Sequence, residues 1–169
     1  MQNAALIPWD DSGQLEVLTF DLEEDTFAVE AALVQEIIDL SPETKVPGAR
    51  PLVGSVINFR GRVIPLADFR LAFGMQPGEA TLDSRIVVIE LDLDGEPTLI
   101  GIKTDKVHEV ASLARHTSED PPAVGMRWRS NFIRSLVRRD QGVVVLPDVH
   151  AIFSTMGDEA HAPAQLYAV

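Results

Sequence analysis

The 169-residue sequence contains no cysteine. That excludes disulfides, zinc–thiolate sites, iron–sulfur clusters and thiol nucleophiles together, and it fits a reducing compartment. The chain also lacks any apolar run near the ~20 residues that a membrane helix needs. Its N-terminus has no basic region followed by an apolar stretch, as a secretory signal would. We therefore expect a cytoplasmic protein that does not insert into a membrane.

Basic residues are scarce: 14 Lys and Arg stand against 26 Asp and Glu, for a net charge of −12. This balance disfavours nucleic acid and anionic membrane surfaces as partners. Five of the basic residues nevertheless cluster within thirteen positions, namely Arg127, Arg129, Arg134, Arg138 and Arg139. Two interpretations stay open for this cluster. It is either a solvated strand edge that resists aggregation or a docking patch for an acidic protein surface.

Signals of catalysis and of metal or cofactor binding are also missing. No two of the four histidines have the H-x-x-x-H spacing, no serine lies in G-x-S-x-G, and there is no glycine-rich phosphate loop. Asp92, Asp94 and Gly95 imitate the start of a calcium loop, but Gly101 stands where the bidentate glutamate is needed. A carboxylate pair could still meet in space without a local signal. The sequence thus predicts no cofactor and no metal, and an enzyme is its least supported interpretation.

Short apolar runs separated by Gly, Pro and Asp turns fill most of the chain. Alternating side chains predict hairpins over residues 18–29 and 89–102, the second with the type I′ dipeptide Asp94-Gly95. Such strands are typical of small β-barrels or a sandwich. The fold class is therefore all-β with short helices. The Pro- and Gly-containing segment 75–84 lies near mid-chain and is a candidate lobe boundary.

Residues 54–69 form the most informative segment. Two apolar runs flank a polar break that ends in Gly61, so we expect a strand, a turn and a second strand. Asn58 and Gly61 shape the turn. Pro65 fits the end of the second strand, because proline has no N–H to donate to the hydrogen-bond ladder of a central strand. Asp68 caps one helical turn. Arg60 is then either solvated or a rigidly presented partner contact.

A weak internal repeat links the two halves of the chain. Residues 34–37 (VQEI) resemble residues 107–110 (VHEV), and each segment follows a predicted hairpin. Residues 63–68 likewise resemble residues 144–148. The repeated order of elements suggests two similar lobes. Glu36, within the first of these segments, is either a solvated strand residue or a partner contact.

A family signature matches the segment around Arg60. CheW-type chemotaxis coupling proteins usually carry G-x-x-N-[LVF]-R-G-x-[VI]-[IVL]-P-x-x-D-L, and the chain resembles this pattern at Gly54, Asn58, Arg60, Gly61, Pro65 and Asp68. The resemblance covers roughly residues 15–153. The chain departs from the family pattern at Arg134, where a glycine is common, and at Pro147, which interrupts the usual Leu-Asp.

The resemblance implies one domain over residues 15–153, with flexible tails at 1–14 and 154–169. Its expected fold is two intertwined, five-stranded SH3-like β-barrel lobes around a shared hydrophobic core. Such proteins are adaptors without catalytic activity or cofactor. They bridge chemoreceptor signalling tips to the regulatory domain of the CheA histidine kinase at membrane receptor arrays. The resemblance implies receptor contacts in the groove between the lobes, at Arg60, Glu36 and Asn58.

One alternative function remains from the residues alone. Small barrels often bind single-stranded nucleic acid through aromatic side chains on a basic groove. Trp128 lies between Arg127 and Arg129 and would serve such a groove, although the net acidity and the aromatic share of 6% weigh against it.

Overall fold

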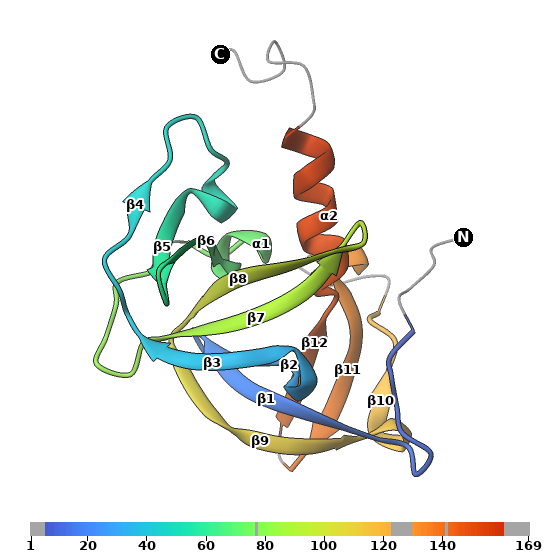
Figure 1. The fold of residues 1–169 in the computed structure, drawn as a ribbon. Coiled ribbons are helices and arrows are strands. Elements are labelled where there is room, and N and C mark those ends of the chain that lie inside the picture. The colour runs from blue at the N-terminus through green and yellow to red at the C-terminus, as the bar shows by residue number, and fades with distance from the viewer. Residues whose placement is uncertain (1–5, 77, 123–129, 141, 161–169) are drawn as a thin grey trace.

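The computed structural model describes residues 6–76, 78–122, 130–140 and 142–160 (Figure 1). Most of them form two six-stranded sheets. Sheet A contains, in spatial order, β10 (Ser118–Glu119), β11 (Ile133–Arg139), β12 (Gly142–Pro147), β2 (Asp25–Glu30), β1 (Gln14–Leu22) and β9 (Lys106–Ala114). Sheet B contains β4 (Thr44–Lys45), β5 (Ser55–Phe59), β6 (Arg62–Asp68), β8 (Glu96–Thr104), β7 (Arg85–Leu93) and β3 (Val34–Asp39). The helical elements are η1 (Ala31–Leu33), η2 (Pro51–Val53), α1 (Phe69–Ala72), η3 (Arg115–Thr117), η4 (Ser130–Phe132) and α2 (Val149–Ala160).

The two sheets have the same plan. Strands β10, β11, β12, β2, β1 and β9 of sheet A correspond, in order, to β4, β5, β6, β8, β7 and β3 of sheet B. Each sheet contains one parallel pair at the same place, β12 with β2 and β6 with β8, and its other pairs are antiparallel. The repeat predicted from the sequence is therefore present in the strand order.

The chain crosses between the sheets twice. The hairpin β1–β2 belongs to sheet A, but the next strand, β3, pairs with β7 in sheet B. The hairpin β7–β8 belongs to sheet B, and the next strand, β9, pairs with β1 in sheet A (Figure 1). Segment 75–84, predicted as a lobe boundary, connects α1 to β7 within sheet B. The sheets are intertwined, and no cut in that segment separates them.

Neither sheet closes into a barrel through a backbone ladder within the described residues. Sheet A ends at β9 and β10, and sheet B ends at β3 and β4. The expected five-stranded barrels are thus six-stranded open sheets here, and the sixth strand in each is only two residues long.

A shared hydrophobic core lies between the sheets. Its largest fully buried side chains include Phe20 and Phe27 from sheet A, and Phe69 and Phe73 from the helical turn that follows β6. The rings of Phe27 and Phe73 are 4.9 Å apart at their centroids, a distance typical of favourable aromatic pairs. Helix α2 adds Phe153, whose ring centroid is 5.7 Å from that of Phe69. Burial of these rings holds the two sheets together.

The structure differs from three local predictions. Pro65 lies inside β6, which continues to Asp68; the ladder with β8 begins only at Leu66, so β6 has a neighbour on one side at the proline. Helix α2 runs to Ala160 and so extends into the segment 154–169, which was expected to be a flexible tail. Ile7 and Trp9, expected in a flexible tail, pack against the core cluster of sheet A.

Candidate partner-binding site

The turn between β5 and β6 holds Arg60 in a fixed backbone conformation. Phe59 pairs with Arg62, and the two residues between them have φ values of +51° at Arg60 and +79° at Gly61. Positive φ at both central residues is the type I′ geometry that matches the twist of a hairpin. The backbone N–H of Gly61 donates to Asn58 Oδ1 at 2.9 Å. The turn-shaping roles predicted for Asn58 and Gly61 are therefore present.

The side chain of Arg60 reaches from this turn to strand β3. Its Nη2 lies 2.9 Å from Glu36 Oε2, and its Cζ lies 5.1 Å from the centroid of the Phe59 ring. The arginine side chain is still 70% exposed, against 36% for the glutamate. The structure thus brings together Arg60, Glu36 and Asn58, which the sequence placed 24 positions apart at most.

The Arg60–Glu36 pair links the edge strand β3 to the β5–β6 hairpin of the same sheet. Glu36 lies on β3, whereas Arg60 lies in the turn of the hairpin whose strand β5 neighbours the other edge strand, β4. Val63 on β6, three residues after Arg60, exposes its aliphatic side chain. We call Glu36, Arg60 and Val63 the sheet B seam. It combines a planar, multi-donor cation with apolar surface, as protein-binding surfaces often do.

Asp68 caps a helical turn, as the sequence predicts. Its Oδ1 accepts a hydrogen bond from the backbone N–H of Arg70 at 3.1 Å and so begins α1. Partial burial raises the pKa of this carboxyl above its ordinary value. Asp148 has the same role in the second half, because its Oδ1 accepts from the N–H of Ala151 at 2.9 Å in α2.

The predicted arginine patch is not a continuous exposed surface in the described residues. Arg134 is only 6% exposed; it pairs with Glu30 at 2.7 Å and donates to the carbonyl oxygen of Pro147. Arg138 and Arg139 pair with carboxylates on other elements, at 3.0 Å each. The buried ion pair corrects the assignment of Arg134 to a partner patch, since its guanidinium is already used inside the fold.

The other two arginines of that prediction, Arg127 and Arg129, lie outside the described residues, as does Trp128.

Sequence reasoning missed a second arginine with a clear structural role. Arg70 pairs with Glu23 at 3.2 Å and with Asp105. The hydrogen bond to Asp105 raises the pKa of Arg70. These partners lie 47 and 35 positions away, in the β1–β2 turn and between β8 and β9, so no short spacing signals them. Arg70 therefore connects α1 to the β1–β2 turn and to the point where the chain passes from β8 in sheet B to β9 in sheet A.

Comparison with known proteins decides the family. The model of the CheW-like domain matches residues 16–156. The chain belongs to the CheW-like domain family. Within the described residues of this CheW-like chain, no group of three or more acidic or histidine side chains could hold a metal ion. None of its described helices is long and apolar enough to cross a membrane.

Relatives and a solved structure agree with that assignment. The chain is 32% identical to the chemotaxis protein CheW of Thermotoga maritima, over 82% of this chain and 87% of the relative. It is 26% identical to a probable chemotaxis protein CheW of Rhizobium etli, over 88% and 93%. The crystal structure of the scaffolding protein TtCheW from Thermoanaerobacter tengcongensis superposes with a TM-score of 0.71 at 27% identity, covering 82% of this chain and 92% of that one. None of these matches supports the nucleic-acid alternative.

Proposed function

We propose that this chain is a non-enzymatic adaptor that couples chemoreceptor signalling tips to the CheA histidine kinase. The observation that carries the proposal is the CheW-like domain match over residues 16–156. Relatives named chemotaxis protein CheW and a neighbour titled scaffolding protein support it. In this role the protein works in the cytoplasm at membrane receptor arrays and uses no cofactor.

The proposed working unit is residues 15–153, with two lobes that behave as SH3-like barrels. In sheet B, the Arg60–Glu36 pair spans the gap that no backbone ladder closes. In sheet A, an ion pair between Arg139 and Glu109 at 3.0 Å spans the corresponding gap. Side chains would thus complete each lobe where its ladder stops.

The proposed receptor contact is the sheet B seam, with Arg60 as its centre and Glu36 and Asn58 as supporting residues. The guanidinium is mostly exposed, while Asn58 and the ladder fix the backbone that carries it. Arginine donates to carboxylates in a planar, two-pronged geometry. A carboxylate on the receptor tip would therefore compete with Glu36 for Arg60, and Val63 would contact an apolar side chain.

The test reverses the charge at Arg60. We expect Arg60→Glu to weaken binding of a purified receptor-tip fragment at least about tenfold, which is ~1.4 kcal/mol, as measured by titration calorimetry. Arg62→Glu is the matched control, because Arg62 is an exposed arginine at the other end of the same turn. Binding to the CheA regulatory domain should persist in both variants. Equal receptor affinity of folded Arg60→Glu and wild type would disprove the contact, and binding of neither partner by the wild type would disprove the adaptor role.

A further inference from the structure

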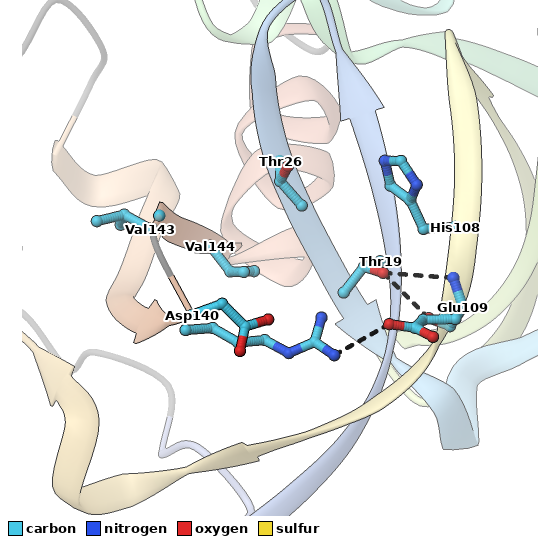
Figure 2. Close-up of a pocket in the computed structure, with 9 residues that line it drawn as sticks. Thr19, Thr26, His108, Glu109, Asp140, Val143 and Val144 are labelled. Carbon is cyan, nitrogen blue, oxygen red and sulfur yellow. Dashed lines mark hydrogen bonds and ion pairs between the residues drawn. The ribbon is translucent and has the colours of Figure 1, made fainter.

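Sheet A contains an open cavity of about 510 Å³ between strand β9 and the β11–β12 hairpin. Figure 2 shows Glu109 on one side of it and Asp140 on the other, with Thr19 between them. The Thr19 hydroxyl donates a hydrogen bond to the carbonyl oxygen of Glu109 at 3.1 Å and accepts one from the N–H of Glu109 at 3.4 Å. These bonds hold β9 in place beside the cavity, although the outer edge of β9 has no strand neighbour in the described sheet.

This cavity occupies the place in sheet A that the Arg60–Glu36 pair occupies in sheet B. Strand β9 corresponds to β3, and the β11–β12 hairpin corresponds to β5–β6. Glu109 matches Glu36 in the repeated V-x-E segment, and each glutamate pairs with an arginine at the end of the facing hairpin. Val143 matches Val63, since each is the second residue of the returning strand, and each is exposed. We call Glu109, Arg139, Asp140 and Val143 the sheet A seam.

The two seams expose opposite charges. In the sheet B seam the arginine is 70% exposed and the glutamate 36%. In the sheet A seam the arginine is 32% exposed and the glutamate 65%. One ion pair thus presents its cation to solvent, and the other presents its anion.

The remaining groups around the cavity strengthen its negative character. Asp140, in the hairpin turn, has no ion-pair partner among the described residues. His108 adds no free cation, because its Nε2 lies 2.8 Å from Asp21 Oδ2. The Thr26 hydroxyl also donates to Asp21, at 3.0 Å. Glu109 and Asp140 therefore offer carboxylates to an incoming group, and Arg139 neutralises only part of their charge.

We infer that the sheet A seam is a second docking site, which takes a protein segment that presents a lysine or arginine side chain beside an aliphatic one. The basic head group would meet Glu109 and Asp140, and its aliphatic stem would lie along Val143 and Val144, which line the cavity. A cavity of this volume accommodates one such side chain with its neighbours. The inference stands apart from the receptor contact, because it concerns a different sheet and the opposite charge.

The experiment is an NMR titration of the full chain with two acetylated, amidated peptides, Val-Lys-Val-Arg-Val and Val-Glu-Val-Asp-Val. The basic peptide should shift amide resonances of residues 108–110 and 143–144, leave residues 60–63 unchanged, and bind more weakly at higher salt. Glu109→Gln should weaken binding of the basic peptide about fivefold, as the loss of one exposed charge contact predicts. Glu36→Gln, the same change in the sheet B seam, should leave its affinity unaltered.

Three results would overturn the inference. The first is no shift of the resonances of residues 108–110 with millimolar basic peptide. The second is shifts of those resonances with the acidic peptide that are as large as those with the basic one. The third is an equal loss of affinity for the basic peptide in Glu36→Gln and Glu109→Gln. Asp140→Asn provides an independent variant if Glu109→Gln fails to fold, because asparagine tolerates the positive φ of that turn residue. Asp140→Asn should also weaken binding of the basic peptide, and unchanged affinity would count against the site.

Discussion

Arg60 is one of four described non-glycine residues with positive φ, and Glu23, Asp94 and Asp140 are the others. A side chain in the left-handed region costs free energy unless its surroundings hold it there. Here the β5–β6 ladder and the Asn58 side chain hold it. The exposed ion pair with Glu36 contributes at most about 1 kcal/mol to stability. All four positive-φ residues stand first in a two-residue hairpin turn, so the backbone conformation at Arg60 follows from the turn type.

Gly61 tests how much this turn depends on its backbone conformation. We expect Gly61→Ala to lower the free energy of unfolding by about 1 kcal/mol, because its φ of +79° is unfavourable for a residue with a Cβ atom. No atom lies within 4 Å of the position of that Cβ, so the cost is conformational and not steric. Gly142→Ala is the control, since Gly142 also has open space but no positive φ. Equal losses in urea denaturation would contradict the explanation.

Single strands and turns followed closely from the sequence, because their signals are local. Asp94-Gly95 gave the β7–β8 turn, and Asn58 with Gly61 gave the β5–β6 turn. The pairing of β3 and β9 with the opposite sheets did not follow, since alternation of side chains defines a strand but not its neighbour. The contact between Arg60 and Glu36 was not predicted, because the family resemblance gave each residue a receptor role without placing one beside the other.

The ion pairs that join strands of sheet A to one another were not predictable for a related reason. Arg134 with Glu30 and Arg139 with Glu109 join residues far apart in sequence, so the arginine cluster looked like one surface patch. Which carboxylate each arginine contacts depends on which strand lies opposite it. Only the three-dimensional sheet order supplies that information.

The Arg70 contacts give a prediction for the elements that they join. Arg70→Ala should cost about 2 kcal/mol of stability, because it leaves Glu23 and Asp105 without their cation. A Cβ on Gly78 would lie 2.3 Å from Arg70 Nη1, so Gly78→Ala should displace the guanidinium and remove part of the same energy. In the double variant the two losses should overlap by roughly 0.5 kcal/mol or more, measured as a double-mutant cycle.

The control for this cycle is Arg138→Ala, in which an exposed arginine loses one exposed carboxylate partner. It should cost less than about 1 kcal/mol and be additive with Gly78→Ala. Strict additivity of Arg70→Ala and Gly78→Ala would show that the glycine is needed for some reason other than the position of Arg70.

At the scale of the whole molecule, the two crossings make the sheets interdependent. Sheet A takes β1 and β2 from the first half of the chain and β9 to β12 from the second, while sheet B takes β3 to β6 from the first and β7 and β8 from the second. The shared core draws its phenylalanines from both halves as well. We therefore expect a single cooperative unfolding transition for the full chain.

A chain divided between residues 80 and 81 tests this interdependence directly. The first fragment would retain β1–β6 without β7 and β8, the two strands that lie between β3 and β6 in sheet B. The second would retain β7–β12 without β1 and β2, the two strands that lie between β9 and β12 in sheet A. Each fragment alone should lack a cooperative transition and show poorly dispersed amide resonances, because its sheets are incomplete and its share of the core is exposed. Mixed in equal amounts, the fragments should recover dispersion and a cooperative transition. Folding of either fragment alone would show that one sheet is stable without the exchanged strands, and the cut site would then be a domain boundary after all.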